Sequence, residues 1–157
     1  MSNNGNSRKV FAQNKKARHD FSIEDTYEAG IALTGPEVKS VREGRANLKE
    51  SYARVRDGEL FLIGAHISPY ENAVRTEQLP TRDRKLLLHR AQISRLTGKA
   101  QEDGKTLIPL RLYEKNGNVK LEVAVASRKQ EYDKRRDIAK KTAAREIQRA
   151  IKERARS

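Results

Sequence analysis

Two dipeptides in the sequence favour tight β-hairpin turns, and they limit the folds that the chain can adopt. Asp57-Gly58 and Asn116-Gly117 each lie between two short runs rich in apolar residues. A two-residue hairpin turn needs positive φ at its central positions, which Asn, Asp and Gly tolerate best. The sequence therefore predicts two antiparallel hairpins. Their strands cover residues 52–55 with 60–63, and 107–113 with 119–126.

Outside the hairpins, the residue pattern predicts one further strand and two helices. Loose alternation of apolar and polar residues predicts a strand over about 19–33. Pro36 suits the first turn of a short helix over 37–43. After a long loop over 68–81, leucine and isoleucine at three- and four-residue spacing predict a helix from residue 84 to about residue 101.

The order of these elements indicates the fold class. We expect a mainly β protein, a small antiparallel OB-like barrel of about six strands with inserted helices. A split α+β sandwich is the alternative. The length of 157 residues fits one domain plus a tail. The expected segments are a disordered basic lead over 1–13, an OB-like barrel over 14–130 and a basic tail, disordered or helical, over 131–157.

The charge of the chain is concentrated at its two ends. The formal net charge is +13. Residues 1–20 hold five basic groups and one acid, and residues 127–157 hold twelve and five. Residues 21–126 are nearly balanced, with seventeen basic groups and fifteen acids. A near-neutral body with two basic ends favours a polyanionic partner, with the ends acting as arms.

The sequence excludes several classes of protein. It has no cysteine, which excludes a disulfide scaffold, a thiolate metal site and a cysteine nucleophile. None of its three histidines has a second metal ligand at helical spacing, and it shows no catalytic acid pair or glycine-rich phosphate loop. Its apolar runs are far shorter than the ~20 residues of a membrane span, and its polar N-terminus lacks a secretory signal. We therefore expect a soluble cytoplasmic protein, not an enzyme, with no metal or cofactor.

The basic tail combines good helix formers with a thin apolar stripe. Ile138, Ala143, Ile147 and Ile151 make up this stripe. Isolated helices are marginal unless an apolar face is buried. We therefore expect the tail to be mostly disordered alone and to fold when phosphates neutralise its cations. The alternative is a solvated helix packed on the barrel.

Six short strings are informative when they are read together: Asn14-Lys15-Lys16-Ala17-Arg18-His19, Tyr27–Leu33, Glu37–Gly44, Asn47-Leu48 with Ser51-Tyr52, Arg84–His89 and Tyr132-Asp133-Lys134-Arg135. In this order and spacing they closely resemble small protein B, the SsrA-binding (transfer-messenger-RNA-binding) protein family of bacteria. The resemblance covers roughly residues 8–157, and the strings are specific only in combination. One departure is Ser127-Arg128-Lys129, where the family often has Gly-Lys-Lys.

The resemblance implies a role in ribosome rescue. It implies that the barrel holds the tRNA-like domain of transfer-messenger RNA (tmRNA), which alanyl-tRNA synthetase charges and elongation factor Tu accompanies to a stalled ribosome. The tail would occupy the decoding centre and the empty mRNA channel of the small subunit during trans-translation. The alternative is a generic OB-type nucleic-acid-binding or ribosome-associated protein, although aromatic residues make up only 5% of the chain. The uneven charge favours a monomer.

The resemblance also implies which residues of the body contact tmRNA. The Glu28 carboxylate can accept from a base amino or imino group, and Leu87 can contact an unstacked base. The plainer alternatives are an exposed strand residue for Glu28, a core position for Leu87 and a solvated loop for the cations. The expected tmRNA contacts are Asn14, Lys15, Lys16, Arg18, His19, Glu28, Arg84, Lys85, Leu87 and Lys120.

A second set of residues is expected to contact the ribosome. Tyr132 can stack on a base of ribosomal RNA. The cations that follow would lie along phosphates of the mRNA channel, and two isoleucines would give the induced helix an apolar edge. The expected ribosome contacts are Arg128, Lys129, Tyr132, Asp133, Lys134, Arg135, Lys140, Lys141, Arg145, Ile147, Arg149 and Ile151.

Overall fold

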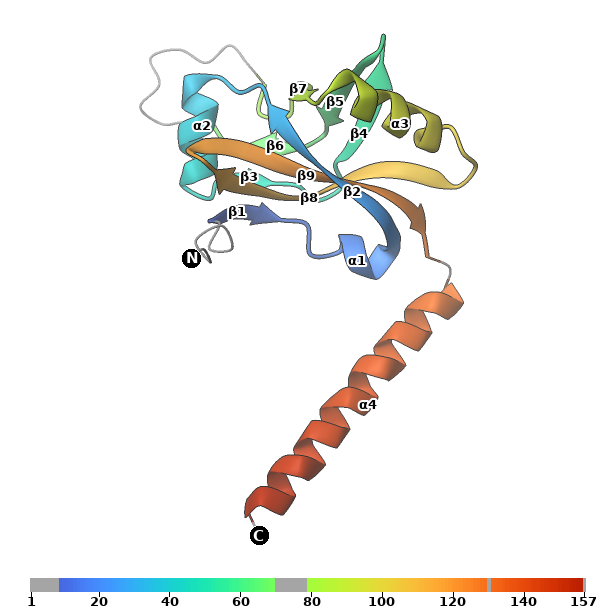
Figure 1. Cartoon of the computed structure of the whole chain (residues 1–157). Helices are drawn as coiled ribbons and strands as arrows, with labels where there is room; N and C mark the ends of the chain where they lie inside the picture. The colour runs from blue at the N-terminus through green and yellow to red at the C-terminus, as the bar shows by residue number, and fades with distance from the viewer. Residues whose placement is uncertain (1–8, 70–78, 130, 157) are drawn as a thin grey trace.

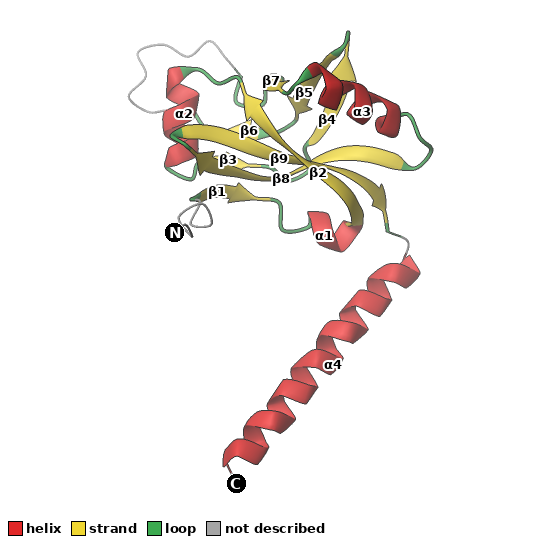
Figure 2. Ribbon diagram, viewed as in Figure 1, coloured by secondary structure: helices red, strands yellow, loops and turns green. Residues whose placement is uncertain are grey.

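The computed structural model describes residues 9–69, 79–129 and 131–156. A β-rich body is followed by one long helix at the C-terminus (Figures 1 and 2). The elements in chain order are β1 (Val10–Gln13), α1 (Ala17–Asp20), β2 (Phe21–Ile31), α2 (Gly35–Arg42), β3 (Ala46–Asn47), β4 (Tyr52–Arg56), β5 (Glu59–Ile63), β6 (His66–Ile67), β7 (Arg84–Leu87), α3 (Arg90–Ala100), β8 (Lys105–Lys115), β9 (Asn118–Arg128) and α4 (Glu131–Arg156).

The main sheet has seven antiparallel strands in the order β1-β8-β4-β5-β7-β2-β9, and β8 also pairs with β9. The second pairing turns six of the strands into a nearly closed ring, to which β1 adds at the edge of β8. The strand pairing is most extensive along β9, which pairs with β2 on one edge and with β8 on the other. It is least extensive between β4 and β8, which pair at Ala53–Leu107. The predicted barrel of about six strands is confirmed.

Both predicted hairpins are present, with the expected turn conformation. Asp57 and Gly58 have φ of 53° and 77°, and Asn116 and Gly117 have φ of 52° and 80°. Positive φ at both central residues matches the right-handed twist of the flanking strands. The second hairpin joins two strands of 11 residues each, so it forms the longest ladder of the barrel.

The core fills the inside of the ring, and a smaller cluster lies outside it. Inward-facing residues of the strands, together with Val41 of α2 and Leu96 of α3, make up the main core. Ala17 of α1 covers the smaller cluster, which includes Ile108 and Ala126 on the outer surface of the sheet. This cluster explains how a helix of only four residues stays fixed on the barrel.

Residues 84–87 form strand β7, so the predicted helix starting at residue 84 is wrong over residues 84–89. Arg84 and Leu86 are buried, whereas Lys85 and Leu87 are exposed, which is the period-two alternation of a strand. The helix α3 begins only at Arg90. This short run of basic residues and leucines fits the period of a helix as well as that of a strand. It forms a strand because it pairs with β2 and β5.

Residues 10–13 form strand β1, so the expected disorder of residues 1–13 is wrong at this end. Phe11 is buried in the main core, and β1 pairs with β8 from Val10 to Gln13. A single buried aromatic residue in a polar segment is a weak sequence signal. Residues 1–8, and residues 70–78 of the expected loop, lie outside the described part of the chain.

The helix α2 matches the short helix predicted after Thr34. Thr34 and Glu37 form a capping box, because the Thr34 hydroxyl accepts from the Glu37 N–H and the Glu37 carboxylate accepts from the Thr34 N–H. Pro36 lies in the first turn, where a missing N–H costs nothing. Glu37 therefore has a fixed backbone position next to the barrel.

The C-terminal helix α4 projects away from the barrel (Figure 1). It is continuous over 26 residues, so of the two forms expected for the tail, disordered or helical, the structure has the helical one. The side chains described for it, at 135 and 138–154, are all exposed, so the alternative of a helix packed on the barrel is wrong. Good helix formers and a length beyond ~12–15 residues both favour such a helix, and its folding on phosphates stays a prediction. Among the helices that the structure describes, none combines the length and the apolar composition of a transmembrane span.

Candidate RNA-binding site

The outer surface of strands β7, β2, β9 and β8 brings together residues that are far apart in the sequence. Gly30 of β2 lies opposite Leu87 of β7 on one side and opposite Lys120 of β9 on the other. Directly opposed residues of antiparallel strands point to the same face. Since Glu28 lies two positions before Gly30, it shares this face. We call Glu28, Gly30, Leu87 and Lys120 the outer-face cluster.

Glu28 is held in place by two neighbours from β8. The Tyr113 hydroxyl donates to Glu28 Oε2 at 2.5 Å, and Lys115 Nζ donates to Glu28 Oε1 at 2.9 Å. The carboxylate is half-buried, so these contacts fix its direction. A fixed carboxylate can accept from the amino or imino edge of a base, while Lys115 offsets its repulsion of nearby phosphates.

Leu87 is exposed, although most leucines of the barrel are buried. Its exposed fraction is 51%, whereas that of the adjacent Leu86 is 1%. Single exposed leucines are common on protein surfaces, but this one lies beside Glu28 and Lys120. The outer-face cluster therefore offers an apolar side chain, a carboxylate and a cation within one small area. Lys85 lies on the same face, where its Nζ is 2.9 Å from Glu59 Oε2.

Asn14 fixes the loop before α1 to the barrel. Its backbone N–H donates to Leu110 O at 2.7 Å, and its side-chain amide donates to Pro109 O at 3.0 Å. The Asn14 carbonyl also accepts from the N–H of Ala17, the first residue of α1. The predicted contact residue Asn14 thus positions the basic residues that follow it, from a half-buried place of its own.

The two basic ends of the chain meet beside α1. Lys129 Nζ donates to Arg18 O at 2.9 Å, and the Lys129 N–H donates to Asp20 O at 2.8 Å. The Arg128 guanidinium lies 5.8 Å from the centre of the Phe21 ring. The sequence assigned the first group to tmRNA and the second to the ribosome, yet they form one surface. This α1 cluster consists of Lys15, Lys16, Arg18, His19, Arg128 and Lys129, and all but Lys129 are exposed.

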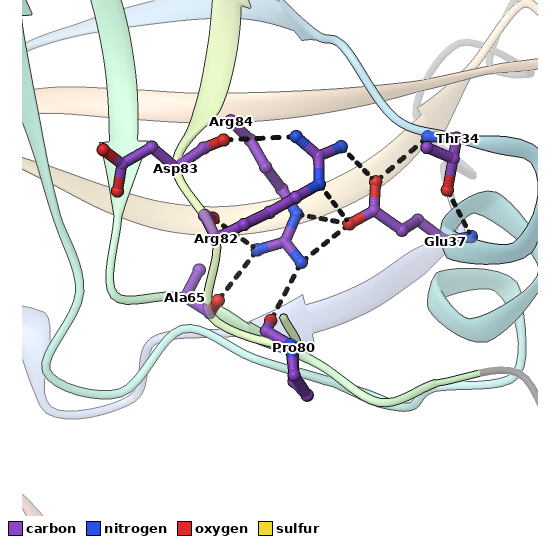
Figure 3. A network of polar contacts seen from close by, with 7 residues as sticks. All are labelled: Thr34, Glu37, Ala65, Pro80, Arg82, Asp83 and Arg84. Atoms are coloured by element: carbon purple, nitrogen blue, oxygen red, sulfur yellow. Dashed lines mark hydrogen bonds and ion pairs between the residues drawn. The ribbon is translucent and has the colours of Figure 1, made fainter. Parts of the chain in front are cut away.

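Arg84 is buried, although it was expected to contact RNA. Its guanidinium donates to Glu37 Oε2, to Ala65 O and to Pro80 O, each at 2.9 Å (Figure 3). Its exposed fraction is 0%. With its donors used inside the protein, Arg84 cannot reach a phosphate outside. The sequence could not show this, because an arginine beside a lysine reads as part of a basic surface.

The Glu37 carboxylate is the centre of this buried network. Arg82 donates to it from Nε at 3.0 Å and from Nη2, and Arg84 donates to it from the other side. Burial raises the pKa of Glu37, but the hydrogen bonds from Arg82, from the Thr34 N–H and from Arg84 outweigh burial and lower it overall. Burial also disfavours the charged form of Arg84 and so lowers its pKa, while the hydrogen bond and charge of Glu37 oppose this shift. The network ties α2 to β7, the strand that presents Leu87.

The expected ribosome-binding residues of the tail lie on α4. Tyr132, Asp133 and Lys134 belong to its first turn, and their side chains lie outside the described residues. The remaining members expected on α4 are all exposed: Arg135, Lys140, Lys141, Arg145, Ile147, Arg149 and Ile151. Ile138 is also exposed, at 53%, so the apolar stripe of the helix is uncovered.

Three residues of β8 beside the outer-face cluster were missed by the sequence analysis. They are Arg111, Tyr113 and Lys115. A β-bulge between Pro109 and Arg111 shifts the register of β8 against β9. A shift of one residue exchanges the two faces of a strand, so simple alternation along β8 could not place these side chains.

Comparison with known proteins gives a consistent assignment. A protein-family model described as "SmpB protein" matches residues 11–153. An SsrA-binding protein of Rubrobacter xylanophilus is 77% identical over 146 residues, which cover 93% of this chain and 97% of that protein. An SsrA-binding protein of Halothermothrix orenii is 59% identical over 148 residues, 94% of this chain and 96% of that protein.

A solved structure agrees with these relatives. It is described as "tmRNA-SmpB: a journey to the center of the bacterial ribosome", and one of its chains is 46% identical to this chain. The match has a TM-score of 0.64 and covers 76% of this chain and 84% of that one. Since the family model and the relatives span nearly the whole sequence, the motifs of the sequence and the barrel of the structure lead to one assignment: the chain belongs to the SmpB family of SsrA-binding proteins.

Proposed function

We propose that the chain is an RNA-binding adaptor whose barrel and helix α4 have separate partners. As a member of its family, it is an SsrA-binding protein that acts with tmRNA on the ribosome in trans-translation, and it is not an enzyme. The observation that carries the proposal is the convergence of Glu28, Leu87 and Lys120 on one face of the barrel.

The barrel binds the tRNA-like domain of tmRNA through the outer-face cluster and the α1 cluster. An exposed leucine beside a fixed carboxylate suits an unstacked base of an RNA loop. The exposed cations near α1 suit phosphates and ribose 2′-hydroxyls, which orient an RNA without reading its sequence. Arg84 is left out of this surface, because its guanidinium is used inside the protein.

Helix α4 enters the decoding centre and the empty mRNA channel of the small subunit. Its exposed cations match the phosphates of a channel made of RNA, and its exposed isoleucines give it an apolar edge. The protein works in the cytoplasm as a monomer. Through the RNA, it meets elongation factor Tu and alanyl-tRNA synthetase without needing a surface for either.

Binding of a transcript of the tRNA-like domain tests the role of the barrel. We expect Leu87→Asp and Glu28→Ala to abolish binding in a filter or anisotropy assay, while the melting temperature stays close to that of the original chain. Leu79→Asp is the matched control, since Leu79 is 70% exposed and lies before β7 rather than on the sheet. Glu28→Gln separates charge from packing, because it can still accept from Tyr113. Full binding by Leu87→Asp would refute the assignment.

Removal of α4 tests the division between the two parts. We expect a chain ending at residue 131 to bind the transcript nearly as well as the full chain, and to fail in peptide tagging on ribosomes stalled without a stop codon. Tagging supported by the shortened chain would show that α4 is not the part that reads the empty channel.

A further inference from the structure

We propose that an open pocket between α1 and the outer face binds a phosphate group of the tmRNA backbone, and that Arg111 makes its central contact. The inference rests on the proposed function and names a subsite that joins the two clusters. The pocket has a volume of about 600 Å³. It is lined by Gln13, Asn14, Lys15, Arg18, Leu110, Arg111 and Glu122.

The charge of the pocket favours an anion. Lys15, Arg18 and Arg111 supply three cations, and Glu122 supplies the single acid. Lys15 and Arg18 are exposed at the α1 side, whereas Arg111 lies on β8 at the sheet side. A phosphate in the pocket would therefore meet cations from both α1 and β8, and charge-assisted hydrogen bonds from arginine to phosphate are strong and often bidentate.

The backbone fixes both walls. The two hydrogen bonds from Asn14 to Pro109 and Leu110 hold the loop that presents Lys15 against β8. The bulge between Pro109 and Arg111 lies at the same place. Because a bulge redirects the side chain beside it, the local irregularity of β8 and the anchor of the loop both serve this pocket.

The Arg111 guanidinium is held in place by two neighbours. It lies 5.0 Å from the centre of the Tyr113 ring, a cation–π contact that holds its plane. Its Nε is 3.4 Å from Glu122 Oε1, and this buried Nε has no hydrogen-bond partner among the residues that the structure describes. Arginine carries five N–H donors in a fork that fits a phosphate. The contacts with Tyr113 and Glu122 thus position this fork before RNA arrives.

The position of Arg111 would make one continuous track of the two clusters. Arg111 is opposite Glu122 on β9, and Glu122 is opposite Glu28 on β2. The row therefore begins at the pocket and ends at the outer-face cluster. An RNA strand with its phosphate in the pocket can place the adjoining nucleotide near Glu28 and Leu87 while its backbone continues toward α1.

The competing explanation is a purely structural cross-strand pair, and it predicts the opposite sign for one variant. If Arg111 and Glu122 only stabilise the sheet, removing either charge weakens the fold. If Arg111 binds phosphate, Glu122 competes with the phosphate and repels it. Glu122 also faces Glu28 directly, and like charges in that position destabilise a sheet. Neutralising Glu122 should therefore strengthen RNA binding without lowering stability.

The test measures the affinity of the full chain for the tRNA-like transcript at several salt concentrations. We expect Arg111→Gln to weaken binding about tenfold, in line with the loss of one charge-assisted contact. The slope of log affinity against log salt should fall by about 0.7–0.9, the contribution of one phosphate. Glu122→Gln should strengthen binding severalfold. Arg111→Lys should keep the slope, and Arg54→Gln, on the exposed side of β4, should change neither quantity.

Melting temperatures of all the variants make the outcome decisive. Weaker binding by both Arg111→Gln and Glu122→Gln, each with a lower melting temperature, would show a structural pair and overturn the proposal. An unchanged salt slope for Arg111→Gln would overturn it as well. If Leu87→Asp and the original chain bind the transcript equally, the proposed function fails instead, so the two failures can be told apart.

Discussion

Leu87 lies across from Gly30 so closely that a Cβ added to Gly30 would be 3.3 Å from the Leu87 Cβ. Such a contact is tighter than most Cβ contacts in proteins, and a side chain at residue 30 would push Leu87 outward. Gly30 has an ordinary backbone conformation, since its φ is not among the positive values. The glycine therefore matters for the space above it, which lets Leu87 lie over β2.

The first prediction concerns this pair. We expect Gly30→Ala to weaken binding of the tRNA-like transcript by about 1 kcal/mol, because Leu87 loses its place beside Glu28 and Lys120. The fold should tolerate the change, since alanine also restricts the unfolded chain. In a Leu87→Ala background the same substitution should have no effect. A double-mutant cycle measures this coupling, and additive effects would show that Gly30 does not act through Leu87.

The second prediction concerns the buried arginine. We expect Arg84→Ala to lower the free energy of unfolding by about 3–5 kcal/mol, because it removes the buried partner of Glu37 and the guanidinium donors to Ala65 O and Pro80 O. Arg82→Ala should cost less, since Arg82 is partly exposed. Urea denaturation measures both. Lys85→Ala, which removes an exposed pair, is the control and should cost at most about 1 kcal/mol. Equal losses for Arg84 and Lys85 would contradict the network.

The third prediction concerns acid stability. The folded pKa of Glu37 is lower than its usual value of 4.5. A carboxyl with a lowered pKa stabilises the fold above its unfolded pKa, and this stabilisation disappears as the pH falls through the folded pKa. We therefore expect Glu37→Gln to be less stable near neutral pH and to lose less on acidification below about pH 5. Melting curves against pH check this, with Glu59→Gln as an exposed control. Parallel acid limbs for the variant and the original chain would contradict it.

The fourth prediction concerns the independence of α4. Because the side chains described for this helix are exposed, we expect its removal to leave the melting temperature of the barrel almost unchanged. The far-ultraviolet circular dichroism should lose the signal of about one long helix at the same time. A large fall in melting temperature would show that the barrel needs the helix.

The hairpins could be predicted from the sequence because a local signal decides them. Asp57-Gly58 and Asn116-Gly117 carry the required positive φ within the turn itself. The alternation in β7 was missed for the opposite reason. A run of three leucines after two basic residues fits a helix and a strand alike, and only the pairing with β2 and β5 separates them.

The site could be predicted in part. Resemblance selected Glu28, Leu87 and Lys120, and the sheet register brings them together. It also selected Arg84, whose burial depends on Glu37, 47 residues away in the sequence. Arg111 was beyond reach, because its direction follows from a bulge and from an anchor at Asn14, neither of which leaves a pattern in the sequence.

Strand β9 carries Lys120 near one end and Arg128 at the other, and it is hydrogen-bonded along both of its edges. A strand that is hydrogen-bonded along both edges keeps its length and register, so the eight residue steps from Lys120 to Arg128 span roughly 26 Å, at about 3.3 Å per residue. The rigid strand thus fixes the distance between Lys120, in the outer-face cluster, and Arg128, which lies just before helix α4. Adding two residues directly after Lys129 would move the helix relative to the bound RNA while Arg128 and Lys129 keep their places beside α1.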